Sequence, residues 1–165
     1  MATRDSDKSI QQPVLDRLFD FEPQSRVEAP LTREQQLRQL KASLRRDLEW
    51  LLNSRRTPDP VPEAYRHLTD SVYCYGLPDT GSFALLSSRE QQRFLRALES
   101  TLARFEPRLQ TVRVSMQTPG PHTRVLRFHI DGLLKLDPVP ERICFDTVLQ
   151  LASGQYEVER EYAPR

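Results

Sequence analysis

An acid and a base stand on either side of a proline at one of the stiffest points of the chain. Pro107 separates Glu106 from Arg108 in the run Phe105–Leu109. Proline fixes its own φ and disfavours helical backbone at the residue before it, so the run is predicted to be extended. Alternate side chains of an extended chain point the same way. A carboxylate and a guanidinium presented together suit charge-assisted hydrogen bonds across an interface, and the alternative is an ordinary internal ion pair.

Glu106 is also the best candidate for acid catalysis, but its neighbours argue against that use. Glycoside hydrolysis needs a carboxyl group in an apolar pocket, facing a second one about 5 to 10 Å away. Arg108 instead favours the ionised carboxylate, which is the wrong form for a general acid. The chain has only five glycines, and neither a phosphate-binding loop nor a G-x-S-x-G motif is present. We expect no catalytic residue and no enzyme, with a peptidoglycan-cleaving, lysozyme-like enzyme as the alternative.

The histidines and cysteines, which are the commonest zinc ligands, are scattered along the sequence. His67, His122 and His129 show no zinc-ligand spacing, and Cys74 and Cys144 form no C-x-x-C pair. We expect both cysteines to be reduced, buried small hydrophobes. The sequence therefore predicts neither a metal site nor a cofactor.

Charge and apolar content are ordinary for a soluble globular protein. A net charge of +1 gives no argument for nucleic acid or a membrane surface. No apolar run approaches the about 18 residues that cross a bilayer, and the N-terminus lacks the apolar core of a signal peptide. We expect a cytoplasmic protein without membrane insertion or nucleic-acid binding. A third candidate function is a protein that binds nucleic acid or another anionic surface through its basic residues Arg38, Lys41, Arg45 and Arg46.

Two helices are expected before the acid–base motif. Thr32 and Gln35 form a capping box, and an apolar stripe at three- and four-residue steps continues to near Asn53. Ser87 and Glu90 form a second capping box. The helix that they begin should end at the proline of the motif, because the residue before a proline leaves the helical region.

After the motif the apolar period changes from 3.6 to 2, which predicts strands. The predicted strands cover residues 112–116, 126–136, 143–151 and 156–160. Gly132 is expected to place a bulge in the second strand, and Ser153–Gly154 to close the last hairpin. The fold class is therefore α+β, with two main helices packed on one face of a mostly antiparallel β-meander.

The first 30 residues are expected to form a flexible, partner-docking segment ahead of a single domain at residues 31–165. Their polar composition is interrupted by apolar side chains: Val14, Leu15, Leu18, Phe19 and Phe21. Polar segments of this kind do not fold alone. We expect residues 1–30 to be mobile or extended in the free protein and to become helical on a partner near Val14–Phe19. The alternative is packing on the chain's own domain.

Five short motifs, in this order, resemble the TssE family of type VI secretion baseplate subunits and, more distantly, the "lysozyme-like" wedge proteins of tailed-phage baseplates. They are VLDRL at Val14–Leu18, RRDLE with LLNSRR at Arg45–Arg56, YGLPD at Tyr75–Asp79, FEPRL at Phe105–Leu109 and FDTVL at Phe145–Leu149. The resemblance covers residues 13–160.

The resemblance implies a non-enzymatic baseplate adaptor at the inner-membrane face. Its partners would be the wedge proteins TssF and TssG, with TssK as a further candidate, and the contractile sheath, which begins to polymerise on it. The residues that would bind the wedge partners are Glu106, Pro107 and Arg108, together with Leu15, Asp16, Arg17 and Leu18. The sheath would join by strand addition at an exposed sheet edge.

Overall fold

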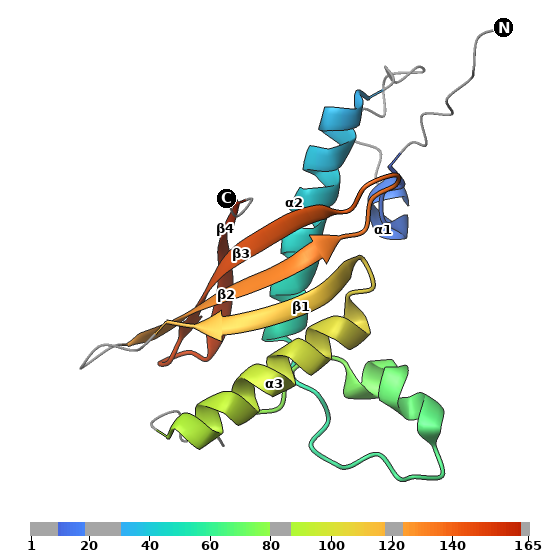
Figure 1. Ribbon diagram of the computed structural model, residues 1–165. Coiled ribbons are helices and arrows are strands. Elements are labelled where there is room, and N and C mark those ends of the chain that lie inside the picture. The colour runs from blue at the N-terminus through green and yellow to red at the C-terminus, as the bar shows by residue number, and fades with distance from the viewer. Residues whose placement is uncertain (1–9, 19–30, 80–86, 118–123, 163–165) are drawn as a thin grey trace, which may run out of the picture.

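The computed structural model describes residues 10–18, 31–79, 87–117 and 124–162 (Figure 1). These residues form three α-helices, two short 3-10 helices and one four-stranded sheet. None of the described helices is long and apolar enough to cross a membrane.

Helix α2 (Arg33–Asn53) begins as predicted, at the capping box of Thr32 and Gln35, where each side chain accepts a hydrogen bond from the other residue's backbone N–H. Helix α3 (Ser88–Phe105) also begins where predicted and ends before Pro107. Its second capping box is wrong, however, because the side chain of N-cap Ser87 makes no capping hydrogen bond. Glu90 instead accepts a hydrogen bond from the Arg93 guanidinium at 3.0 Å.

The four strands form an antiparallel meander in the order β1-β2-β3-β4. Their bounds are β1 (Leu109–Met116), β2 (Val125–Leu134), β3 (Glu141–Gln150) and β4 (Gln155–Tyr162). α3 packs against β1, its Phe94 ring lies 5.7 Å from the ring of Phe128 on β2, and α2 packs against β4. Buried leucines of both helices join alternate strand residues such as Phe145 in one core. The predicted α+β fold is confirmed.

The bulge lies in β1, so its predicted place in β2 is wrong. Gln110 pairs with Leu133 and Arg113 pairs with Asp131, which leaves an extra residue on β1 opposite Gly132. Thr111 takes up the irregularity with a φ of +52°. A Cβ on Gly132 would lie 3.4 Å from the Gln110 carbonyl oxygen. Gly132 lies on β2 opposite the bulge, and its lack of a side chain leaves space for the extra residue of β1. β2 itself pairs with β3 without interruption.

A close backbone approach fastens the connection between α2 and α3. Gly76 has a φ of +101°, and a Cβ there would lie 2.4 Å from the Ser54 carbonyl oxygen. That oxygen accepts the Leu77 N–H at 2.9 Å, while the Leu77 carbonyl accepts the Arg56 N–H at 3.0 Å. The YGLPD turn thereby places Leu77 in the core, fully buried. Two short helices, η1 (Arg66–Asp70) and η2 (Val72–Cys74), precede this turn.

Candidate partner-binding site

The acid–base motif forms the corner between α3 and β1, and its two charged side chains meet as predicted. Arg108 Nε donates to Glu106 Oε1 at 2.6 Å, and Arg108 Nη2 donates to the other carboxylate oxygen. The Arg108 backbone N–H also donates to Glu106 Oε1, at 3.2 Å. The result is a bidentate pair held by the corner itself, the strongest geometry that these two groups form.

Glu106 is buried, whereas a carboxylate that bonds directly to a partner across an interface would be exposed in the monomer. Glu106 is 4% exposed, whereas the Arg108 side chain is 22% exposed. The corner folds tightly, since the Glu106 N–H donates to the Leu102 carbonyl and the Glu106 carbonyl accepts the Leu109 N–H. The carboxylate therefore faces inward, and Arg108 is the member of the pair that solvent reaches.

Asp47 on α2 is a third member of this site, and sequence reasoning did not single it out. Arg108 Nη2 donates to Asp47 Oδ2 at 2.8 Å. The other oxygen of Asp47 accepts hydrogen bonds from Arg46, at 2.9 and 3.1 Å. Arg46 in turn donates to Asp16 at 2.7 Å. The signal for Asp47 in the sequence was its place in the RRDLE motif, but nothing local indicated its partner.

These contacts form a continuous row of alternating charges, which we name the charge chain: Asp16, Arg46, Asp47, Arg108 and Glu106. It joins helix α1, helix α2 and the corner before β1. The two segments that the sequence predicted as partner-binding, which lie far apart along the chain, are therefore joined by one row of contacts. Three carboxylates and two guanidiniums leave the charge chain with one net negative charge.

The electrostatics of the charge chain keep its bases ionised. Burial lowers the pKa of Arg108, but hydrogen bonds to Glu106 and Asp47 outweigh this effect and hold the pKa above its usual value. The hydrogen bond to Asp16 is the main cause of the raised pKa of Arg46. Burial, and then the nearby carboxylates of Asp47 and Glu106, raise the pKa of Tyr75. The Tyr75 ring packs edge-on against Phe105, 5.4 Å away, beside the corner.

Helix α1 (Val14–Leu18) lies against α2 and is helical without a partner (Figure 1). This differs from the expectation that the segment becomes helical only on a partner. Hydrogen bonds supply the reason: the Ile10 N–H and the Gln12 side chain both bond to Gln36, at 3.1 and 2.9 Å, and Asp16 pairs with Arg46. The rest of the predicted flexible segment, including Phe19 and Phe21, lies outside the described residues.

Only the polar face of α1 packs on the domain. Val14, Leu15 and Leu18, which we name the α1 apolar surface, are 63%, 56% and 75% exposed. Arg17 is exposed as well. On α2, Trp50 is 55% exposed, and the Arg46 guanidinium lies 5.0 Å from the centre of its ring. Arg46 thus connects Asp16 to a second exposed apolar side chain, which the sequence analysis did not single out.

Two of the four basic side chains that suggested an anionic-surface binder, Lys41 and Arg46, are engaged with acids. Lys41 contacts both Glu141 and Glu161 at 2.8 Å, and Arg46 belongs to the charge chain. Because these bases already have carboxylate partners, they offer little free positive charge to phosphates. This arrangement weighs against the third candidate function.

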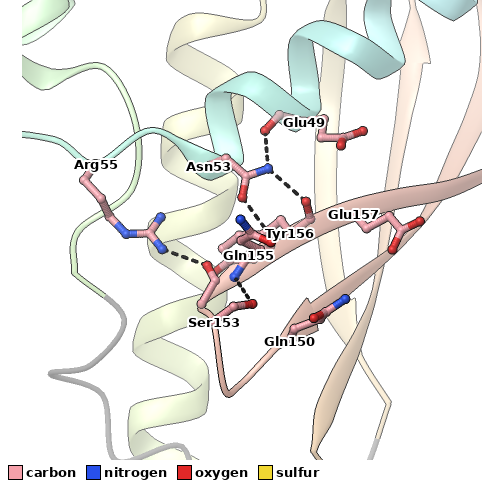
Figure 2. A pocket seen from close by; sticks show the side chains of 9 residues that line it. Glu49, Asn53, Arg55, Gln150, Ser153, Gln155, Tyr156 and Glu157 are labelled. Carbon is pink, nitrogen blue, oxygen red and sulfur yellow. Dashed lines mark hydrogen bonds between the residues drawn. The ribbon is translucent and has the colours of Figure 1, made fainter.

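A polar cleft lies elsewhere, between the end of α2 and the β3–β4 hairpin (Figure 2). Asn53 donates to the Tyr156 carbonyl at 2.8 Å and accepts the Tyr156 N–H at 2.9 Å. Arg55 donates to the Gly154 carbonyl at 2.8 Å. Figure 2 shows these side chains turned toward the hairpin backbone. Asn53 and Arg55 therefore hold the β3–β4 hairpin against the end of α2, so the polar groups of the cleft have a structural role.

Comparison with known proteins places the chain in a family. The family model described as baseplate wedge protein gp25 matches residues 38–139, which include most of α2 and the corner with Glu106, Pro107 and Arg108. No curated protein and no solved structure matches the chain. Since the matched residues make up well over half of its length, the chain belongs to the family of baseplate wedge protein gp25, to which TssE also belongs.

Proposed function

We propose that the chain is a non-enzymatic baseplate subunit of a type VI secretion system, which binds the wedge proteins TssF and TssG and starts the contractile sheath. Family membership identifies it as a structural component of a phage-tail-like baseplate, and such a component interacts with other baseplate components. The resemblance of its five motifs to TssE supports the narrower assignment, and TssK is a further candidate partner. Its place would be cytoplasmic, at the inner-membrane face.

One observation carries the proposal: the charge chain unites the two segments that the resemblance assigns to wedge partners. It holds α1 against α2 so that Leu15 and Leu18 point away from the domain, more than half exposed. Exposed apolar side chains gathered by fixed elements are typical of protein–protein contact sites. Arg108, which is partly exposed and is joined to α1 through the charge chain, supplies a polar contact.

The site residues take different roles in this proposal. Leu15 and Leu18 contact the partner directly, and Asp16 positions them through Arg46. Arg17 is exposed and is available for a polar contact. Glu106 and Pro107 act from below the surface, by holding Arg108 in place. Burial of Glu106 therefore changes its proposed role from direct contact to positioning.

The enzyme alternative is less well supported by this geometry. Glu106 is held in a bidentate pair with the Arg108 guanidinium, and the same guanidinium bridges it to a second carboxylate, Asp47. A glycosidase acid needs an apolar setting that favours its protonated form. Release of sugar from peptidoglycan by the purified protein, abolished by Glu106→Gln, would support the alternative.

Sheath initiation would use a sheet edge. β1 and β4 are the two edge strands of the described sheet. A sheath strand added to either one would pair through backbone hydrogen bonds and would need few specific side chains.

The α1 apolar surface gives the sharpest test. We expect the double substitution Leu15→Ser, Leu18→Ser to abolish co-purification with TssF and TssG, while the melting temperature stays within a few degrees of the parent, because neither side chain is buried. Val72→Ser is the matched control, since Val72 is 88% exposed and lies on η2, away from α1. Normal co-purification of the double variant would remove the α1 apolar surface from the proposed site.

A further inference from the structure

The sheet face that turns away from the helices carries a second group of chemically active side chains. β2 and β3 pair so that His129 lies opposite Asp146 and Asp131 lies opposite Cys144. Their neighbours Ile130 and Phe145 are buried in the core, so these four side chains share the opposite face. Tyr162 of β4 lies opposite Cys144 on the same face.

Three of these side chains come within the reach of a single ion. One ligand atom from each of His129, Cys144 and Asp146 lies within 4.8 Å of the other two. The His129 Nδ1 already contacts the Asp146 carboxylate. An imidazole nitrogen, a sulfur and a carboxylate oxygen are all ligands that Zn²⁺ takes in proteins, at about 2.0–2.3 Å. The three atoms are therefore ligands of the kinds that a zinc ion takes, gathered in one place.

We propose that His129, Cys144 and Asp146 form a zinc site, with a water molecule in the fourth position. The ion would enter from the side of His129 and Asp146, whose side chains are 28% and 30% exposed, while Cys144 at 1% exposed forms the closed end. The bound ion would join β2 to β3 across the open face of the sheet. A divalent metal of borderline softness suits this mixed ligand set better than Mg²⁺ or Ca²⁺, which prefer oxygen ligands alone.

The surroundings of the three ligands also fit a metal. When His129 Nδ1 binds the ion, its Nε2 carries the proton and needs an acceptor. The side-chain amide of Gln117 lies 3.0 Å from that Nε2, and turning the amide over presents its oxygen. Ligating histidines are commonly oriented by a hydrogen bond of this kind.

Zinc binds cysteine as the thiolate, so Cys144 would release its proton to solvent when the Zn–S bond forms.

Cobalt titration of the full-length, reduced, tag-free protein tests the site. We expect one Co²⁺ per chain, with a thiolate-to-cobalt charge-transfer band in the near ultraviolet that Zn²⁺ abolishes. Cys144→Ser should lose the band, and Asp146→Asn should weaken binding at least about tenfold. Cys74→Ser is the matched control, because Cys74 is the other cysteine and lies on η2. It should bind cobalt as the parent does.

Several outcomes would overturn the proposal. They are the absence of a charge-transfer band in the parent, an unchanged band in Cys144→Ser, or a lost band in Cys74→Ser. If Cys144→Ser does not fold, His129→Asn takes its place, because His129 is partly exposed and its loss leaves the core intact. Zinc should also raise the melting temperature of the parent and of Cys74→Ser, and it should raise that of Asp146→Asn less at the same concentration.

Discussion

At the scale of single residues, Arg108 joins the corner before β1 to helix α2. Its guanidinium meets both oxygens of Glu106 and one oxygen of Asp47, and its Nη1 is buried without a hydrogen-bond partner among the described residues. A buried polar group without a partner is costly, so this nitrogen offsets part of the stability that the other contacts of Arg108 supply.

Glu106→Gln should destabilise the fold, because it leaves the guanidinium of Arg108 with a weaker, neutral partner in a largely buried place. Breaking one partner of a buried ion pair typically costs about 3–5 kcal/mol, and we expect about 3 kcal/mol here because Arg108 keeps Asp47. Urea unfolding monitored by circular dichroism measures the change. Glu90→Gln, which breaks the surface pair with Arg93, is the control and should cost less than about 1 kcal/mol. Equal midpoints for the two variants would show that the corner is not a structural clamp.

At the scale of elements, two sets of contacts between elements fix the positions of α1 and of the α2–α3 connection relative to α2. The charge chain holds α1 to α2, and the Gly76 turn holds the α2–α3 connection against the end of α2. Neither set of contacts can be predicted from helix or strand propensity, because each one joins residues that are far apart in the sequence.

Asp16→Asn should loosen α1 without unfolding the domain. It removes the charge that pairs with Arg46, while the core beneath is untouched, since α1 contributes no buried residue. Amide hydrogen exchange should become faster at residues 15–18, and the urea midpoint should change little. An exchange rate equal to that of the parent would mean that the bonds to Gln36 suffice to hold α1.

Gly76→Ala should destabilise strongly, for two reasons that act together. Its φ of +101° is strained for any residue with a Cβ, and that Cβ would lie 2.4 Å from the Ser54 carbonyl oxygen, which is backbone and cannot turn aside. We expect a loss of at least about 2 kcal/mol, from strain alone of about 1–3 kcal/mol and the displaced contact. Gly132→Ala is the comparison, because its Cβ would meet its nearest atom at 3.4 Å, and it should cost less. A Gly76→Ala variant as stable as Gly132→Ala would contradict the close approach.

At the scale of the whole molecule, one core joins both helices to the sheet. Leu44 of α2 and Leu98 of α3 lie at its centre, 0% and 2% exposed. We expect Leu44→Ala and Leu98→Ala each to lower the free energy of unfolding by about 2–5 kcal/mol, as buried leucine truncations do. Urea midpoints give the measurement, and Leu151→Ala, at a side chain 46% exposed in the β3–β4 turn, is the control. Unchanged midpoints for both core variants would contradict the shared core.

The helices, the strands and part of the candidate site could be predicted from the sequence, but the contacts between distant site residues could not. The elements could be predicted because their signals are local: the Thr32 cap, the leucine period of α2, the stop before Pro107 and the alternation of the strands each depend on residues a few positions apart. The adjacency of Glu106 and Arg108 followed for the same reason, from one proline. Burial of Glu106 did not, because it depends on how the corner folds against α3 and meets Asp47 from α2.

The tertiary structure decided which distant residues meet. It joined Asp16 to Arg46 and thereby made one site of two motifs, and it turned the leucines of α1 outward rather than onto the domain. Through the register of β2 and β3 it also gathered His129, Cys144 and Asp146, whose spacing along the chain resembles no metal motif. Periodicity reports which face of an element is buried, but only the packing of several elements settles which side chains share a place in space.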